Sequence, residues 1–147
     1  MALGADHAGR WLKDSIKPLL DRLGIAWRDY GTSADASVDY PDFAEAVARA
    51  VADGTCAQGI LVCGTGIGMA MAANKVRGVR AAVCHDSFTA RMSRAHNDAN
   101  VLCLGARVVG SGVAEEAVRT FLETPFEGGR HAARLEKISR IEKGRVE

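Results

Sequence analysis

The sequence predicts an α/β protein built around one mainly parallel sheet of about five strands. Short apolar stretches alternate with amphipathic helical patterns along the whole chain, as expected for consecutive βαβ units. The run Ile60, Leu61 and Val62 is continuously apolar and branched, which is typical of a parallel strand buried on both faces. With 147 residues the chain is long enough for one domain with a sizeable core, and we expect residues 1–147 to form it.

Each strand is inferred from a short apolar run, and each helix from apolar residues spaced three and four apart. In order, we expect a strand at 1–5, a helix at 8–23, a strand at 25–30, a helix at 41–52, a strand at 59–63, a helix at about 66–77, a strand at 79–84, a helix at 87–95, a strand at 100–104, a helix at 112–123 and a helix near 129–143.

The first helix has an extended amphipathic pattern, and Gly24 is expected to end it. Pro18 lies inside this pattern and argues against an unbroken helix. A polar loop, Gly31–Val38, follows the second strand, with Asp39 or Tyr40 near the cap of the next helix. The predicted apolar face of the first helix consists of Trp11, Leu12, Ile16, Leu19, Leu20 and Leu23.

The composition narrows the possible functions. There are 19 basic and 18 acidic residues, so a net charge of +1 provides no broad attraction to nucleic acid or an anionic membrane. The N-terminal segment lacks the basic start and long apolar stretch of a signal peptide, and no apolar stretch is long enough to cross a bilayer. We therefore expect a cytoplasmic protein in which any anion site is local.

The four cysteines, Cys56, Cys63, Cys84 and Cys103, contain no C-x-x-C pair, so the sequence indicates neither a zinc motif nor a disulfide framework. Burial as a small apolar side chain is the ordinary role of a cysteine that closes an apolar run. We assign Cys84 and Cys103 to the core on that ground.

Cys63 differs because a glycine-rich turn follows it. Gly64, Gly66 and Gly68 allow a sharp turn and close approach to a ligand, and the free N–H groups of the next helix favour anions. The spacing does not fit G-x-G-x-x-G, which would need glycine where Met69 or Met71 stands, and no Gly-Lys-Ser/Thr follows as in a P-loop. By itself the turn is compatible with a plain strand-to-helix connection.

Polar clusters accompany other strand ends. The segment 6–9 follows the first strand, 93–100 precedes the fifth, and 127–134 opens the last helix with two arginines four residues apart. Taken singly, Asp6 could cap a helix, the second segment could be a solvated turn, and the arginine pair could be a solvated face. Their occurrence together with the glycine turn favours an anion-binding site.

Several motifs follow one another in order between about Leu3 and Ile141. They are Asp6-His7-Ala8-Gly9, Asp39-Tyr40-Pro41, Cys63-Gly64-Thr65-Gly66-Ile67-Gly68, Ala73-Asn74-Lys75, His96-Asn97-Asp98-Ala99-Asn100-Val101, Gly105-Ala106-Arg107 and Glu127-Gly128-Gly129-Arg130-His131-x-x-Arg134. Together they resemble the B-type ribose-5-phosphate isomerases, which share a family with the galactose-6-phosphate isomerase subunits. The resemblance implies a Rossmann-like three-layer α/β/α sandwich that interconverts ribose 5-phosphate and ribulose 5-phosphate, with no metal or organic cofactor.

The resemblance also implies roles for single residues. Cys63 matches the family's base. A helix N-terminus and nearby cations would favour the thiolate form of such a cysteine. His96 would open the furanose ring, which must precede isomerisation because the cyclic sugar has no free carbonyl. The enediolate would be held by the Thr65 hydroxyl and by backbone N–H groups of Gly64, Gly66, Ile67 and Gly68. Phosphate binding carries over to Arg107, Arg130 and Arg134, with His7 as a helper, and sugar-hydroxyl contacts carry over to Asp6 and Asn97.

In the family the site lies between subunits, so we expect a homodimer or homotetramer with shared sites and with the last helix, about 129–143, at the interface. A second branch of the family uses a glutamate base a few residues after the start of the glycine loop. Because Met69 follows Gly68 and Cys63 is present, this chain fits the cysteine branch. Three alternatives stay open: a six-carbon substrate such as allose or galactose 6-phosphate, a non-catalytic phosphosugar-binding domain, and a thiol-redox protein that uses Cys63.

Overall fold

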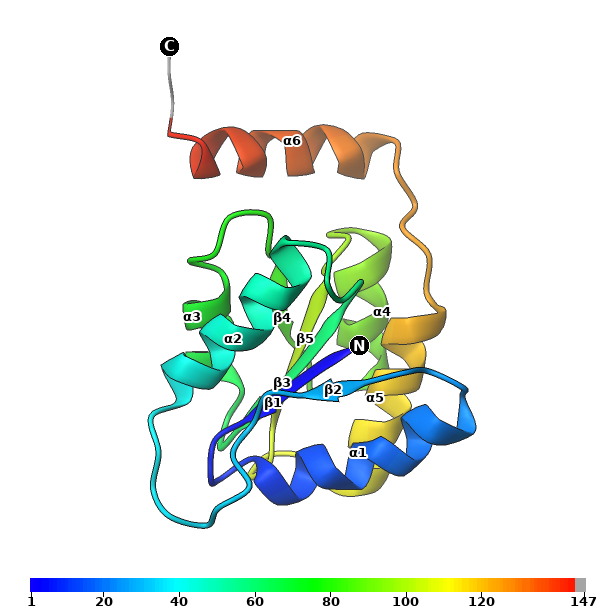
Figure 1. The fold of residues 1–147 in the computed structure, drawn as a ribbon. Coiled ribbons are helices and arrows are strands. Elements are labelled where there is room, and N and C mark those ends of the chain that lie inside the picture. Colours follow the sequence, from blue (N-terminus) through cyan, green and yellow to red (C-terminus); the bar gives the residue numbers. More distant parts are fainter. Residues whose placement is uncertain (145–147) are drawn as a thin grey trace.

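The computed structural model describes residues 1–144 and contains one sheet of five parallel strands flanked by helices (Figure 1). The strands are β1 (Ala2–Ala5), β2 (Arg28–Asp29), β3 (Gly59–Cys63), β4 (Ala81–Val83) and β5 (Val101–Gly105), in the spatial order β2-β1-β3-β5-β4. The helices are α1 (Arg10–Arg22), α2 (Tyr40–Ala52), α3 (Ile67–Ala73), α4 (Ser87–Ala95), α5 (Ser111–Glu123) and α6 (Arg130–Glu142). The last three residues of the predicted domain, 145–147, lie outside the described residues.

The core has two halves, one on each face of the sheet, which confirms the predicted three-layer arrangement. Side chains of α1, α4 and α5 pack on one face, and those of α2 and α3 pack on the other. Alternate residues of β3 serve the two halves, since Ile60 and Val62 face the first group and Leu61 and Cys63 the second. The thiol of Cys63 therefore lies on the α2/α3 side of the sheet.

The predicted strands and helices are all present, but several bounds differ. β2 has two residues rather than six and both are exposed, because it is an edge strand paired only with β1. α3 is also shorter than predicted and ends at Ala73, because the Asn74 side chain bonds the backbone of Ala81 instead of extending a helical face.

Helix α1 continues through Pro18, so the single helix predicted over 8–23 is confirmed despite the proline. The missing N–H and the ring clash cost about 3 kcal/mol, but burial of a side chain such as Leu12 or Leu19 contributes about 1.5–3 kcal/mol. Four such side chains, Leu12, Ile16, Leu19 and Leu20, are fully buried. The assignment of Trp11 to this apolar face is wrong. It is 51 % exposed, because it lies about 100° around the helix from Leu12.

No helix among residues 1–144 combines the length and apolarity that a membrane span requires.

Helix α6 stands apart from the three layers, beyond the edge at which the strands begin (Figure 1). Of its residues only His131 is buried, so α6 adds little to the core.

Candidate functional site

A cavity of about 280 Å³ lies at the carboxyl edge of the sheet, beyond the ends of β1 and β3. After β1 the chain passes to β2 on one side, and β3 then pairs with β1 on the other side. Such a switch point is where open α/β sheets bind ligands, because the connections leave in opposite directions and expose the strand ends. The cavity is lined by Asp6, His7, Ala8, Tyr40, Cys63, Gly64, Thr65, Gly68 and Arg107.

The glycine turn wraps around the Cys63 thiol. The Gly66 N–H donates to Cys63 Sγ at 3.1 Å, and Cys63 is only 6 % exposed. Gly66 has φ 80°, and a Cβ built on it would lie 3.0 Å from the carbonyl carbon of Leu104 in β5. Only glycine fits that position without strain. The resulting turn presents a backbone N–H donor to the sulfur.

Three further side chains surround the thiol, each at the end of a strand or in the turn that follows it. Asp6 Oδ1 accepts the Gly9 N–H at 2.9 Å, which places its carboxylate in the first turn after β1. His7 follows Asp6, and its Nδ1 accepts a backbone N–H at 3.2 Å. The backbone N–H of Arg107 donates to the Gly64 carbonyl at 3.0 Å, and the Arg107 guanidinium passes over Gly64. A carboxylate, an imidazole and a guanidinium therefore meet around Cys63.

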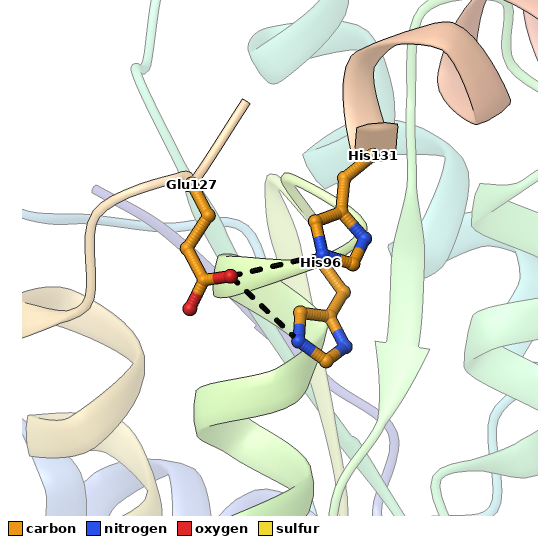
Figure 2. Close-up of side chains that lie close together, drawn as sticks. All are labelled: His96, Glu127 and His131. Carbon is orange, nitrogen blue, oxygen red and sulfur yellow. Dashed lines mark ion pairs between the residues drawn. The ribbon is translucent and has the colours of Figure 1, made fainter. Parts of the chain in front are cut away.

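A second polar cluster, drawn in Figure 2, lies at the opposite edge of the sheet, because His96 comes shortly before β5 begins. Glu127 Oε2 lies 3.9 Å from His96 Nε2 and 3.7 Å from His131 Nε2, and the two imidazole rings stack with centroids 4.1 Å apart. Burial lowers the pKa of His131, and the nearby His96 and Arg130 lower it further against the opposing effect of Glu127. The neutral form of His131 is therefore favoured.

The ligand atoms of His96, Glu127 and His131 lie within 4.8 Å of one another, close enough to be considered for a metal ion. The rings are nearly parallel, with an interplanar angle of 8°, so their nitrogen lone pairs do not converge on one point. Arg130 Nε also lies 3.5 Å from His131 Nε2 and places a positive charge at the cluster. These features favour proton transfer or anion binding over a metal centre.

The structure divides the predicted site residues between these two edges. Asp6, His7, Cys63, Gly64, Thr65, Gly66, Gly68 and Arg107 gather at the carboxyl edge, where the Ile67 amide also donates to Thr65 Oγ1 at 3.3 Å. His96, Asn97, Arg130 and Arg134 lie on α6 or in the turn before β5. The strands between them span roughly 13 Å, at about 3.3 Å per residue. One chain therefore does not bring Cys63 and His96 to the same small ligand.

Three candidate residues had no assigned role in the sequence analysis. Tyr40 lines the Cys63 cavity, and a Cβ on Gly68 would lie 2.7 Å from its ring. Glu127 and His131 join His96. All three stand inside motifs that were recognised, but their contacts depend on how distant segments meet. As predicted, Cys84 and Cys103 are buried in the core, and burial raises the pKa of both thiols.

Comparisons with known proteins identify the family. A family model described as Ribose/Galactose Isomerase matches residues 1–138. Ribose-5-phosphate isomerase B of Escherichia coli is 47 % identical, with 99 % of this chain and 97 % of that protein covered. D-erythrulose-4-phosphate isomerase of Pectobacterium atrosepticum is 45 % identical, with 97 % and 94 % covered.

Among solved structures, ribose-5-phosphate isomerase B of Clostridium thermocellum superposes with a TM-score of 0.95 at 54 % identity. The match covers 97 % of this chain and 96 % of that one. The similarity thus includes both edges of the sheet and extends to α6. This chain belongs to the ribose/galactose isomerase family.

Proposed function

We propose that this protein interconverts ribose 5-phosphate and ribulose 5-phosphate through an enediolate, with Cys63 as the base. Family membership and the names of the relatives from E. coli and C. thermocellum support this substrate. The observation that carries the proposal is the Cys63 thiol, which lies at the switch point of the sheet and accepts the Gly66 N–H at 3.1 Å. A base held beside backbone N–H donors is what an enediolate intermediate requires.

In this mechanism the Cys63 thiolate removes the proton from C2 of the open-chain aldose. The electron pair of that bond forms the C1–C2 double bond, and negative charge develops on the carbonyl oxygen. Backbone N–H groups of residues 64–68 and the Thr65 hydroxyl stabilise this oxygen. The thiol then returns the proton to C1, and the C2 hydroxyl proton passes to O1, which gives the ketose. Arg107 is the guanidinium in the same cavity and binds the substrate's phosphate.

The ring-opening step assigned to His96 requires a second copy of the chain. His96 lies at the far edge of its own sheet, so we propose that His96, Asn97, Arg130 and Arg134 complete the Cys63 cavity of a partner subunit. The described part of α6 supports this assembly. Ile138 and Ile141 are 50 % and 68 % exposed, and with Leu135 they line a cavity of about 440 Å³ between α6 and β4. A two-fold dimer would complete two sites at once.

The first experiment follows ribose 5-phosphate in D2O by proton NMR. We expect the wild type to form the ketose, with deuterium entering at C1 of the ketose and at C2 of the re-formed aldose, and we expect Cys63→Ala to abolish both changes. Cys56→Ala is the matched control, because it removes another buried thiol, outside the Cys63 cavity, and should keep activity. Exchange that persists in Cys63→Ala would show that another group is the base.

A mixing experiment tests whether the site is shared. Cys63→Ala and His96→Gln should each be inactive alone, whereas subunits exchanged between them should regain activity. Random dimers would recover about one quarter of the wild-type rate, since half are mixed and each mixed dimer has one intact site. If mixing restores nothing while the subunits demonstrably exchange, both residues serve the same chain and the shared site is refuted.

A shorter or longer phosphosugar is the second candidate substrate. The relative from P. atrosepticum is named for D-erythrulose 4-phosphate, and the family description includes galactose. Turnover of four-, five- and six-carbon phosphosugars should therefore be compared by kcat/KM. Binding without turnover of any of them would favour a non-catalytic phosphosugar-binding domain, and peroxide or disulfide turnover would favour the redox alternative.

A further inference from the structure

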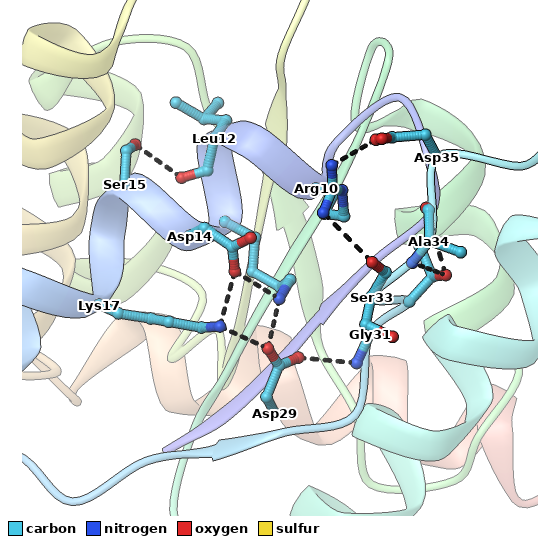
Figure 3. Close-up of polar contacts among 12 residues, drawn as sticks. Arg10, Leu12, Asp14, Ser15, Lys17, Asp29, Gly31, Ser33, Ala34 and Asp35 are labelled. Carbon is cyan, nitrogen blue, oxygen red and sulfur yellow. Dashed lines mark hydrogen bonds and ion pairs between the residues drawn. The ribbon is translucent and has the colours of Figure 1, made fainter.

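The polar loop 31–38 connects β2 to α2 and is fixed to α1 near its start (Figure 3). Arg10 donates to the Ser33 carbonyl at 3.2 Å and forms an ion pair with Asp35. Asp29, at the end of β2, accepts the Gly31 N–H at 2.8 Å through Oδ1. Arg10 at the start of α1 and Asp29 at the end of β2 therefore hold the loop along its first five residues.

Asp29 is itself held by a buried cation. The Lys13 side chain is 2 % exposed and its ammonium pairs with Asp29 and with Asp14, the latter at 2.8 Å. Lys17 bridges the same two carboxylates at 2.6 and 2.7 Å. Burial would raise the pKa of Asp29, but hydrogen bonds from the two lysines outweigh it and hold that pKa below its ordinary value. The two lysines and the two aspartates thus form a cluster of zero net charge next to the loop, in which each lysine pairs with both carboxylates.

The far end of the loop reaches the Cys63 cavity. The Val38 N–H donates to His7 Nδ1 at 3.2 Å, and His7 lines the cavity. A ring nitrogen that accepts a hydrogen bond carries no proton, so in the neutral ring the proton resides on Nε2. A backbone N–H can only donate, so this contact selects one of the two tautomers.

We propose that the loop 31–38 holds His7 as its Nε2–H tautomer, so that His7 offers a neutral donor to an oxygen of the phosphosugar. In this arrangement Val38 is a positioning residue that acts through His7, and Arg10 keeps Val38 in place. The identity of the acceptor rests on the proposed function, whereas the tautomer is a property of the free protein. The two can therefore fail separately.

The direct test is the ¹⁵N NMR spectrum of the imidazole rings in the free protein, with the His7 signals assigned from their loss in His7→Asn. We expect wild-type Nδ1 to resonate as a bare nitrogen and Nε2 as a protonated one. Val38→Pro removes the N–H and should produce a mixture of tautomers, whereas Val38→Ala keeps the N–H and should match the wild type. A wild-type mixture, an Nδ1–H form, or no response to Val38→Pro in the folded protein would overturn the proposal.

A second variant covers the case in which Val38→Pro does not fold. Arg10→Gln removes the contacts to Ser33 and Asp35 and should speed hydrogen exchange at the Val38 N–H about tenfold or more. Arg49→Gln is the matched control, because it removes a surface pair with Glu45 on α2. Equal exchange at Val38 in Arg10→Gln and the wild type would refute the positioning by α1.

Activity supplies the last measurement. Val38→Ala should leave kinetics unchanged, and Val38→Pro should raise KM for ribose 5-phosphate about fivefold with little change in kcat, as expected for one misdirected neutral hydrogen bond. A fall in kcat with KM unchanged would contradict a binding role for His7. If the wild type turns over no phosphosugar, the proposed function fails, and the tautomer measurement still decides whether the loop controls His7.

Discussion

Replacing Gly66 with alanine should damage both the fold and the site, and a second glycine in the chain allows the causes to be separated. Gly66 and Gly54 both have φ 80°. A Cβ on Gly54 would meet nothing within 4 Å, whereas one on Gly66 would lie 3.0, 3.2 and 3.2 Å from backbone atoms of Leu104. Gly54→Ala therefore reports only the cost of the left-handed backbone, and Gly66→Ala adds the close contact.

The left-handed conformation costs alanine about 1–2 kcal/mol, so we expect that loss of unfolding free energy in Gly54→Ala. Leu104 is fully buried in β5 and cannot easily retreat, and overpacking adds about 1–3 kcal/mol. Gly66→Ala should thus lose about 2–5 kcal/mol. Urea unfolding followed by circular dichroism at fixed protein concentration measures both values, provided that the slope with urea is unchanged.

The same substitution should also reach the thiol. Relieving the contact moves the Gly66 N–H away from Cys63 Sγ, so the alkylation of Cys63 by iodoacetamide should slow in Gly66→Ala and not in Gly54→Ala. If the two variants lose the same unfolding free energy within about 0.5 kcal/mol, the contact with Leu104 is soft and the close-approach argument is refuted.

The remaining predictions concern charge. Asp29→Asn deprives the buried Lys13 of one of its two carboxylates and should cost about 2–4 kcal/mol of unfolding free energy, measured with urea. Because the folded pKa of Asp29 lies below 3.8, the stability that Asp29 contributes is complete above that pH and is lost as pH falls through the folded pKa. The unfolding free energy of the variant should therefore fall less steeply than that of the wild type at acid pH. Burial and neighbouring cations hold the pKa of His131 below 6.5, so the wild type should lose stability as pH falls from 6.5 through the folded value, and His131→Gln should not. Arg107→Gln should raise KM for the phosphosugar about tenfold or more with a smaller change in kcat, and an unchanged KM would exclude Arg107 from phosphate binding.

Patterns within one segment predicted most of the fold. The continuously apolar run of β3 predicted a strand buried on both faces, and the spacing of apolar residues predicted α1. The errors arose where a distant segment decides the outcome. The shortening of β2 depends on its edge position. Trp11 is exposed because α1 packs its Leu12 side against the sheet face that α4 and α5 also cover.

The turn around Cys63 was also predictable, because a strand followed by closely spaced glycines limits what the backbone can do. The direction of its N–H groups was not, since it depends on Gly66 meeting Leu104 of β5. The place of Tyr40 in the cavity was not predicted for a similar reason. Its role depends on how α2 packs beside the glycine turn, and nothing in its local sequence reports that packing.

The two polar clusters are each chemically incomplete, and what one lacks the other holds. The Cys63 cavity has a thiol and backbone donors, but among the described residues that line it Arg107 is the only arginine. The His96 cluster has imidazoles with a carboxylate and lies beside Arg130 and Arg134, but it contains no thiol. A cyclic phosphosugar needs a ring-opening acid–base group, an enediolate site and a phosphate grip together. Parallel strands keep the two edges of one sheet apart, which is why the proposed mechanism calls on a second chain to unite them, with each chain supplying half of both sites.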